Sequence, residues 1–496
     1  MMQLKSADLK KTSVDALIIP VCEDKEIHNL RKISSLIKKA KSLNEFAGKK
    51  DDLLILYNLT GIKTERVIYF GLGKLDEINI EGLRSFAGRA AKESIKKKLS
   101  NILIAAPAGQ NITRGIKAEP HSIIKALLEG AYLGNHIFDK YKEEKKLKPL
   151  TEINLLLKPD ATDQFKELPA QVEALCSGTI MAREWISTPS NDKRPEQFTE
   201  SIVANAEKVD LNIEVLDETQ LKQKKFGALL AVAEGSESKP SLICLEYNHS
   251  DAQETIVLVG KGVTFDSGGI NLKPQGALED MKIDMSGAAV VAATMITIAK
   301  LKPKLKVVGV MPVVENMPSG NAARPGDIVK SYSGKTVEIG NTDAEGRLIL
   351  IDAISYSIEK YKPEVIIDIA TLTGACVVAL GEKIAGIFAS DDELAEKILQ
   401  SGQDTNERCW RLPLPDDYQK LLKSGFADIH NISDSRWGGA ITAALFLKEF
   451  TDNKRWAHID IAGPAYIKKE EAYCGNGGTG FGVRLFCDLL EKLSVR

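Results

Sequence analysis

The chain has 496 residues and a mass of 54.2 kDa, which at roughly 100–200 residues per domain predicts two to four domains with room for a sizeable core. Hydrophobic residues make up 44% and charged residues 27%, which excludes wholesale disorder. The net charge of −2 and the pI of about 6.4 give no global reason to expect binding to nucleic acid. This total hides a split, because residues 1–150 hold 28 Lys+Arg and 18 Asp+Glu, a net charge of +10, and the remainder has a net charge of −12.

The cysteines and the apolar stretches indicate a cytoplasmic protein without a membrane span. The seven cysteines are odd in number, widely spaced and without a C-x-x-C pair, which argues against a disulfide framework and a thiolate zinc site. The first residues, MMQLKSADLKKT, contain no apolar signal-peptide core. The longest uncharged stretches, 285–299 and 369–381, are shorter than the roughly 18 residues that a membrane span requires.

The first 160 residues alternate short β-branched runs with longer helical patterns, which predicts an α/β domain. Strands are expected at 15–21, 52–57, 66–73, 101–107 and 152–158, and helices at 81–99 and 121–138. Residues 141–150 form a charged surface stretch, and residues 163–186 are mainly helical in pattern. The segment STPSNDKRP (187–195) is dense in turn-forming residues.

The second part repeats the pattern with more apolar strands, typical of a sheet that helices cover on both faces. Strands are expected at 255–260, 306–314, 364–370 and 456–462, and helices at 287–300, 346–361, 440–450 and 482–493. We therefore predict a two-domain α/β fold in which the larger domain has a central, mostly parallel or mixed sheet. Its parts are a smaller N-terminal α/β domain with an oligomeric or regulatory role (1–162), a connecting helix and loop (163–190) and a catalytic domain (191–496).

The loop after the strand at 255–260 is rich in glycine and charge, and it lies where open α/β sheets collect their chemistry. It reads GKGVTFDSGGINLKPQGALEDMKIDMSGAA over 260–289. Phe265 replaces the third glycine of a dinucleotide-binding fingerprint, and no Gly-Lys-Ser/Thr closes a phosphate loop. A turn-rich surface loop with solvated charges is the simple alternative. Against it, Asp266 stands beside apolar residues and a glycine pair, a poor place for a solvated charge.

A second loop, IGNTDAEGRLILIDAISYSI over 339–358, places Asp343, Glu345 and Arg347 at i, i+2 and i+4. In an extended segment this spacing puts all three on one face. Gly346 then permits a sharp turn, and apolar residues from Leu348 onward continue at helical spacing. Two acids and an arginine thus meet at a helix N-terminus. The structural alternative is an acidic cap with an arginine salt bridge, worth about 1 kcal/mol.

Together the two loops supply four carboxylates: Asp266, Asp284, Asp343 and Glu345. Four clustered anions repel one another unless they are protonated or neutralised, and two divalent cations would cancel their charge. Oxygen ligands favour Mn²⁺ or Mg²⁺, with a carboxylate-bridged Zn²⁺ pair as the alternative. Two metals about 3.5–4 Å apart can activate water and clamp a tetrahedral transition state, and Lys273 and Arg347 would add positive charge near the developing oxyanion. The loops therefore predict metal-assisted hydrolysis.

The histidines and serines offer no competing catalytic set. None of the six histidines forms an H-E-x-x-H pair, and no G-x-S-x-G elbow is present. His458 lies inside a predicted strand and is expected to be a hydrogen-bonded core residue. Asp368 and Asp460 each close a strand, and we expect them either to support the site or to make structural hydrogen bonds.

These residues are similar to those of a known family. The segment Asn341–Leu348, NTDAEGRL, resembles the signature octapeptide of the leucyl (cytosol) aminopeptidases, the M17 metallopeptidases. Further phrases resemble the family in its order and approximate spacing: GKGVTFDSGG (260–269), MKIDMSGAA (281–289), ATLTGA (370–375), GGAITAALFL (438–447), WAHIDIAGPA (456–465) and GTGFGVRL (478–485). The likeness covers about residues 165–496, although STPSNDKRPEQF (187–198) departs from the Asn-Pro-rich wording usual there.

The resemblance implies a role for each residue of the predicted site. Two divalent ions, Mn²⁺ or Zn²⁺, would be held by Lys261, Asp266, Asp284, Asp343 and Glu345, with Asp266 and Glu345 bridging. Lys261 would donate a neutral amine, so burial and the adjacent cations would have to lower its pKa. Lys273 would polarise the scissile carbonyl or stabilise the gem-diolate. Arg347 would hold a bicarbonate anion that relays the proton from the bridging water.

The resemblance also implies an exopeptidase that acts on peptides with a free N-terminus, whose α-amine would bind one metal. Leu-like first residues would be favoured by a pocket lined by Met281, Thr371, Leu372 and Gly374. A homohexamer with its active sites facing an interior cavity is implied as well.

Two other functions stay open at this point. The basic residues 1–150, with Lys96, Lys97 and Lys98, could bind DNA in addition, but lysines interleaved with acids and few aromatics favour a solvated surface. The same carboxylates could serve a two-metal phosphoesterase, although nothing in the sequence resembles a phosphate cradle.

Overall fold

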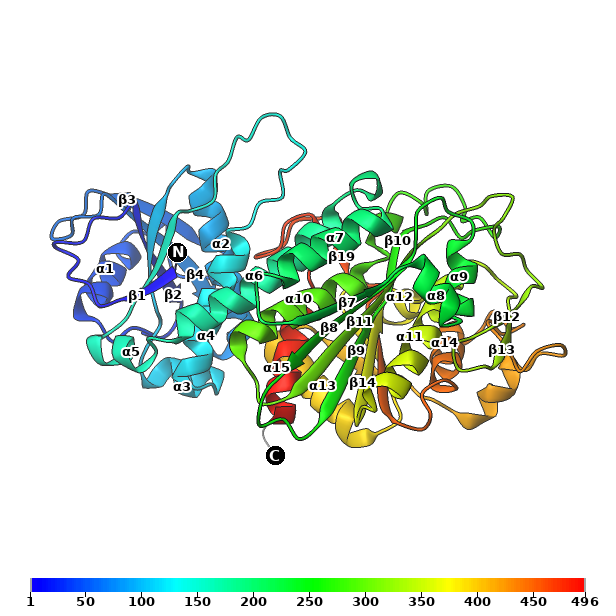
Figure 1. The fold of residues 1–496 in the computed structure, drawn as a ribbon. Helices are drawn as coiled ribbons and strands as arrows, with labels where there is room; N and C mark the ends of the chain where they lie inside the picture. The colour runs from blue at the N-terminus through cyan, green and yellow to red at the C-terminus, as the bar shows by residue number, and fades with distance from the viewer. Residues whose placement is uncertain (1, 495–496) are drawn as a thin grey trace. The chain divides into compact units, whose positions relative to one another are not determined.

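The chain forms two compact units in a computed structural model that describes residues 2–494 (Figure 1). Unit 1 comprises Met1–Cys176 and Lys469–Asn476, and unit 2 comprises Ser177–Lys468 and Gly477–Arg496. The division falls inside helix α6 (Leu168–Ser187). Each unit contains a β-sheet and helices, so the prediction of a two-domain α/β protein is confirmed.

Unit 1 is built on a six-stranded sheet in the order β1-β6-β5-β2-β4-β3. All neighbours are parallel except β3 and β4, which makes the sheet mixed. The strands are β1 (Met2–Lys5), β2 (Ala16–Cys22), β3 (Leu53–Tyr57), β4 (Arg66–Gly73), β5 (Asn101–Ala105) and β6 (Glu152–Leu156). The helices before α6 are α1 (Arg31–Lys41), α2 (Ile80–Lys96), α3 (Gln110–Ile116), α4 (Pro120–Gly134) and α5 (Pro159–Gln164).

Two features of unit 1 explain its local sequence. Helices α2 and α4 cross so closely that a Cβ on Gly130 would lie 2.0 Å from the carbonyl oxygen of Arg84, so glycine is required there. The predicted helix over 163–186 begins later than expected, at Leu168, because residues up to Gln164 belong to α5. Residues 141–148 are exposed, as predicted from their charge.

Unit 2 is built on a nine-stranded mixed sheet in the order β16-β15-β18-β14-β9-β11-β8-β7, with β10 paired to β11. The strands from β18 to β11 are parallel, and β8, β7 and β15 run antiparallel to their inner neighbours. The strands are β7 (Asn212–Leu216), β8 (Ser241–Asn248), β9 (Thr255–Gly260), β10 (Gly262–Asp266), β11 (Lys306–Asn316), β14 (Val365–Ala370), β15 (Ala385–Ala389), β16 (Cys409–Arg411) and β18 (Arg455–Asp460). Smaller sheets join β12 (Ile328–Lys330), β13 (Thr336–Glu338) and β17 (Ile429–His430), and β19 (Tyr466–Ile467) with β20 (Gly477–Gly478).

Helices cover both faces of this sheet, as the unbroken apolar strands predicted. On one face α10 packs on β8, β9, β11 and β14 beside α7 and α15, and on the other α11 packs on β9, β11 and β14 beside α9 and α14. Alternate residues serve the two layers, so Val257 and Val259 join the core around α11. The helices of unit 2 after α6 are α7 (Pro195–Ala206), α8 (Glu218–Gln223), α9 (Gly227–Ala233), α10 (Ser286–Leu301), α11 (Glu345–Tyr361), α12 (Gly374–Leu380), α13 (Asp392–Thr405), α14 (Gly439–Lys448) and α15 (Val483–Ser494).

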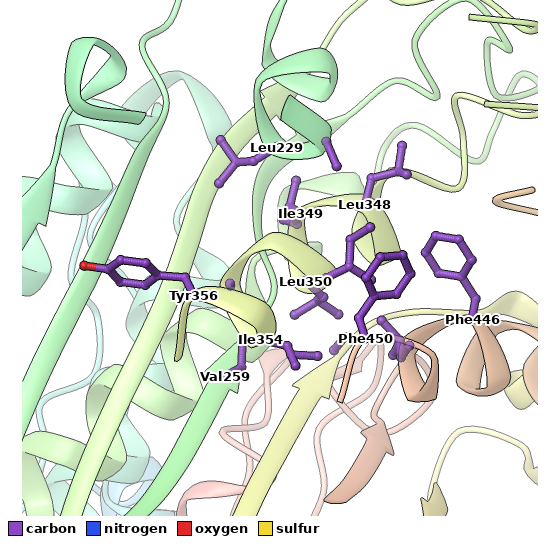
Figure 2. Packing of buried hydrophobic residues seen from close by; sticks show 14 of the residues in the cluster. Leu229, Val259, Leu348, Ile349, Leu350, Ile354, Tyr356, Phe446 and Phe450 are labelled. Carbon is purple, nitrogen blue, oxygen red and sulfur yellow. The ribbon is translucent and has the colours of Figure 1, made fainter. Parts of the chain in front are cut away.

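Helix α11 is buried from Glu345 to Ser357 and organises the larger core. Figure 2 shows Leu348 and Leu350 near Phe446 and Phe450 of the α14 region, and Leu229 of α9 on another side. Each fully buried side chain of this kind contributes about 1.5–3 kcal/mol. The dense packing around α11 fixes the position of its first turn, where two predicted site residues lie.

One carboxylate, Asp352, is fully buried in this core. Its Oδ2 accepts a hydrogen bond from the N–H of Leu229 at 2.9 Å, and its Oδ1 accepts one from the N–H of Tyr332 at 2.7 Å. Burial raises the pKa of Asp352 to about 7, although these hydrogen bonds oppose the rise. Asp352 thus anchors the first turn of α9 from α11.

Among residues 2–494, one segment, Met281–Leu301, is long and apolar enough to cross a membrane by length and composition. The mean hydropathy of its most apolar 18 residues is 1.4, and 89% of this stretch is buried inside the molecule. The segment contains α10, whose place on the central sheet accounts for its apolar composition.

Candidate metal centre

The carboxylates of the two loops lie together at the carboxyl-terminal edge of the unit 2 sheet. Asp266 ends β10, Asp284 follows the 3-10 turn Met281–Ile283, and Asp343 precedes α11, of which Glu345 is the first residue. One carboxylate oxygen from each of Asp266, Asp343 and Glu345 lies within 4.8 Å of the others, a spacing that could hold a metal ion. The segment 343–347 is not extended, because the helix begins at Glu345.

Lys261, between β9 and β10, is buried among these acids. Its Nζ is 2.8 Å from Asp284 Oδ2 and 2.8 Å from Glu345 Oε1, and it donates to the carbonyl oxygen of Thr371 at 3.0 Å. A Cβ on Gly346 would lie 2.7 Å from both Cε and Nζ of Lys261. The predicted sharp turn at Gly346 is therefore wrong, since this residue lies inside α11 and its missing side chain makes room for Lys261.

Lys273 joins the remaining two acids. Its Nζ is 2.8 Å from Asp266 Oδ2 and 2.6 Å from Asp343 Oδ1. Its side chain keeps 15% of its surface exposed, against 3% for that of Lys261. Of the two ammonium groups, Lys273 is therefore the one that a small molecule can approach.

The electrostatics of the cluster fit divalent cations. Burial raises the pKa of Asp266, Asp284 and Asp343, and repulsion between neighbouring carboxylates adds to the rise while the lysines oppose it. Glu345 Oε2 is buried and has no hydrogen-bond partner among residues 2–494. Four carboxylates face two ammonium groups here, and carboxylate oxygens are the ligands that hard metals prefer.

The pKa of Lys261 is set by its neighbours. Burial alone would lower it, but the carboxylates of Asp284, Glu345 and Asp266 outweigh burial and raise it. Lys273 behaves in the same way beside Asp266. The lowered pKa implied for a ligating Lys261 would require divalent cations to take over these carboxylates.

Arg347, in the first turn of α11, is buried with donors to spare. Its Nη1 donates to the carbonyl oxygen of Asn431 at 2.7 Å, and its Nε has no hydrogen-bond partner among the described residues. Burial lowers its pKa to about 10, against the attraction of Glu345 and Asp460, so the guanidinium keeps its charge near neutral pH. A buried cation of this kind can hold a small anion.

The residues predicted to line the first side-chain pocket lie on two segments. Thr371 is buried, and its Oγ1 donates to Asp284 Oδ1 at 2.7 Å, while Met281 accepts from the N–H of Asp284 through its carbonyl oxygen at 3.3 Å. Leu372 is half-buried, and Gly374, the first residue of α12, is exposed. Thr371 thus contacts the Asp284 carboxylate, and Met281 contacts the Asp284 backbone.

Sequence reasoning missed the amides that orient the site. Asn316, at the end of β11, donates through Nδ2 to Asp266 Oδ1 at 2.8 Å and to the carbonyl oxygen of Thr342 at 3.1 Å. Asn431 accepts through Oδ1 from the N–H of Gly340 and donates through Nδ2 to the carbonyl oxygen of Asn341. The strand predicted at 306–314 stops before Asn316, so no signal in the sequence indicated this contact.

His458 is a core residue, as predicted. It is 1% exposed, and its Nδ1 lies 2.5 Å from Asp368 Oδ1, which raises its pKa against the effect of burial. Asp368 Oδ2 also accepts from Trp456 Nε1 at 2.7 Å. Asp460 accepts from Thr373 Oγ1 at 2.7 Å and from two backbone N–H groups, so both aspartates make structural hydrogen bonds.

Comparisons with known proteins find matches in both units. Residues 180–487 match the description "Cytosol aminopeptidase family, catalytic domain", and residues 20–145 match "Cytosol aminopeptidase family, N-terminal domain". The chain is 39% identical to a probable cytosol aminopeptidase of Chlorobium phaeobacteroides, over 98% of both proteins, and 42% identical to one of Syntrophotalea carbinolica, over 90% of both. The solved structure titled "Bottromycin maturation enzyme BotP in complex with Mn" is similar with a TM-score of 0.85 and 32% identity, covering 97% of this chain and 100% of that one.

Proposed function

Because this chain belongs to the cytosol aminopeptidase family of metal-dependent exopeptidases, we propose that it removes Leu-like N-terminal residues from peptides with two divalent ions at the site described above. Asp266 and Glu345 would be shared by both ions. Lys261 and Asp284 would be further ligands of one ion, and Asp343 would be a further ligand of the other. When bound, the two ions, Mn²⁺ or Zn²⁺, supply Lewis acidity and a water of lowered pKa, and a bicarbonate anion supplies a proton acceptor.

Lys273 is proposed to act on the scissile carbonyl. Its ammonium is the more exposed of the two, and its contacts with Asp266 and Asp343 keep it protonated beside the acids. A donor held there can polarise the carbonyl oxygen and stabilise the negative charge of the gem-diolate. Removing one such donor typically lowers kcat by about 10²–10³-fold.

Arg347 is proposed to hold the bicarbonate. Its Nη1 is committed to Asn431, which fixes the plane of the guanidinium, and its Nε is left to donate. The side chain is buried, so an anion bound there would be shielded from bulk water and its charge would be well neutralised.

Met281, Thr371, Leu372 and Gly374 are proposed to form the pocket for the first side chain. In support, Thr371 contacts the Asp284 carboxylate and Met281 lies three residues before Asp284, which would place this pocket beside one metal. Since the substrate α-amine would bind a metal, a blocked N-terminus should abolish turnover. Comparing leucine with glutamate p-nitroanilide tests the preference for apolar residues.

Family membership over both domains also supports a cytoplasmic homohexamer, in which residues 1–162 would take the oligomeric or regulatory role. Multi-angle light scattering should then give a mass of six chains. A monomer at micromolar concentration would contradict this assembly.

The observation that carries the proposal is the placement of Lys261 within 2.8 Å of two carboxylates, beside a cluster of three acids within 4.8 Å. The test is hydrolysis of leucine p-nitroanilide with added Mn²⁺, before and after chelation, by the wild type and by Asp343→Ala. Chelation and the substitution should each abolish hydrolysis. Hydrolysis of the anilide that persists after chelation and in Asp343→Ala would reject the aminopeptidase mechanism. Hydrolysis of p-nitrophenyl phosphate but not of the anilide would also reject it.

A further inference from the structure

A buried lysine outside the metal centre holds the segment that carries Asp284. Lys193 is 2% exposed, and its Nζ donates to three backbone carbonyl oxygens: those of Trp185 at 2.8 Å, Ile186 at 3.3 Å and Lys282 at 2.7 Å. An ammonium has three N–H donors, and these three acceptors match them. Lys193 belongs to STPSNDKRP, the segment whose wording departs from the related family.

Burial, with repulsion from Lys282 added to it, lowers the pKa of Lys193 well below its ordinary value, so a charge held here needs an explanation. An ammonium taken out of water is costly unless hydrogen bonds replace its hydration. Backbone carbonyls do so here, and their placement is informative. Two of the carbonyls belong to the last turn of α6, where the helix dipole also stabilises a cation. The third belongs to the 3-10 turn Met281–Ile283. Lys193 therefore ties the end of one helix to that turn.

The same loop reaches both halves of the metal centre. Lys282, which Lys193 contacts, stands two residues before Asp284, and the Oγ of Ser190 donates at 2.9 Å to the carbonyl oxygen of Thr264, two residues before Asp266. Neither contact touches a carboxylate. Residues 187–193 thus hold the backbone that presents Asp266 and Asp284.

Two other side-chain contacts near the 3-10 turn are weaker. Lys468 pairs with Asp280 at 2.7 Å, but its side chain is 73% exposed, and an exposed pair of this kind contributes little. The ammonium of Lys282 lies 5.9 Å from the ring centroid of Tyr466, near the limit for a cation–π interaction. The buried Oγ of Ser286 donates to the carbonyl oxygen of Ile283, but it belongs to helix α10, which follows the turn directly, whereas Lys193 connects the turn to a distant segment of the chain.

We propose that Lys193 is a positioning residue for metal binding: it fixes the turn before Asp284, with Ser190 doing the same for Asp266, and so sets the affinity of the site for divalent ions. This inference rests on the proposed function. Groups that orient metal ligands typically contribute about 10–100-fold to metal affinity. Lys193 contacts neither the carboxylates nor Lys273, so the bound site should turn over substrate with its usual KM.

The test is a titration with Mn²⁺ of the wild type, Lys193→Met and Ser190→Ala, in which electron paramagnetic resonance measures the concentration of the free ion. Methionine keeps an unbranched side chain of similar length and removes all three donors. We expect the dissociation constant for Mn²⁺ to rise about 10–100-fold in Lys193→Met and less in Ser190→Ala. At saturating Mn²⁺, the KM for leucine p-nitroanilide should stay within about twofold of the wild type.

Thr199→Val is the matched control. Thr199 donates to the carbonyl oxygen of Pro195 and shares a hydrogen bond with Ser241, so this change removes neighbouring hydrogen bonds that lead to neither metal segment. Its Mn²⁺ affinity should equal that of the wild type. If Lys193→Met does not fold by circular dichroism, Lys193→Gln, which retains an amide donor, replaces it and should show a smaller rise.

The outcomes separate this inference from the proposed function. Two Mn²⁺ per wild-type chain with unchanged affinity in the Lys193 variant would overturn the positioning role and leave the function standing. An equal loss of affinity in Thr199→Val would also overturn it, since the effect would then be general. No Mn²⁺ binding by the wild type would reject the proposed function itself.

Discussion

Replacing Gly346 by alanine gives a sharp test of the site because two physical effects predict opposite results. Gly346 is the second residue of α11 and has an ordinary helical backbone. On propensity alone, Gly→Ala in a helix stabilises a protein by about 0.5–1 kcal/mol. Packing at the site predicts a loss of stability instead. The new Cβ would lie 2.7 Å from Cε and Nζ of Lys261, about 0.7 Å closer than the 3.4 Å at which ordinary contact begins.

A lysine end can usually move away, but this one is held. Its Nζ contacts Asp284, Glu345 and the carbonyl oxygen of Thr371, all buried. Moving it breaks these contacts and shifts a proposed metal ligand. We expect overpacking to cost about 1–3 kcal/mol and Mn²⁺ affinity to fall about 10–100-fold.

The assay combines the melting temperature with Mn²⁺ titration. Gly82→Ala is the control, because Gly82 lies in the first turn of α2 and its added Cβ would meet atoms no closer than 3.5 Å. This control should melt at or above the wild-type temperature. A Gly346→Ala variant that melts no lower than the wild type and binds Mn²⁺ as tightly would refute the reasoning.

Three further predictions concern Arg347, Asn316 and Asp352. Arg347→Ala should lower kcat about 10²–10³-fold with little change in KM, and it should remove the response to added bicarbonate; steady-state kinetics with and without bicarbonate checks this, and retained stimulation would contradict it. Asn316→Ala removes the donor to Asp266 Oδ1, so Mn²⁺ titration should show about 10–100-fold weaker binding, and an unchanged titration would count against it. Burial raises the pKa of Asp352 to about 7 in the folded chain, above the roughly 3.9 of an aspartate in an unfolded chain. The contribution of Asp352 to the free energy of unfolding is therefore complete below about pH 3.9. It falls by up to about 1.4 kcal/mol per pH unit as the pH rises from there toward 7. Urea unfolding at pH 5, 6 and 7 should show the wild type losing this stability relative to Asp352→Asn, and a constant difference would contradict it.

The fold could be predicted at the centre of the larger sheet. Residues 255–260 and 365–370 are mostly apolar because helices pack on each side, with Asp368 the one charged residue among them, and such runs are recognisable in a sequence. The strands Asn212–Leu216 and Cys409–Arg411 at the two edges of the sheet were not predicted, because they are short and partly exposed and lack that signal. Their inner neighbours Ser241–Asn248 and Ala385–Ala389 are mostly buried, yet they were not predicted either.

The candidate site divides in the same way. The four carboxylates stand in two charged segments that together predict a metal site, and the octapeptide resemblance is confirmed by the family match. Residues that orient the site gave no such signal. Asn316 reaches Asp266 across 50 residues, Asn431 reaches Arg347 across 84, and Lys193 reaches Lys282 across 89. Their roles depend on contacts that exist only once the chain has folded.

The proposed function requires that two divalent ions share Asp266 and Glu345. Anomalous diffraction at the manganese edge from a crystal soaked in Mn²⁺ measures this directly. We expect two peaks per chain, both beside these two carboxylates, one also next to Lys261 and Asp284 and the other next to Asp343. A single peak, or two peaks that do not share Asp266 and Glu345, would contradict it.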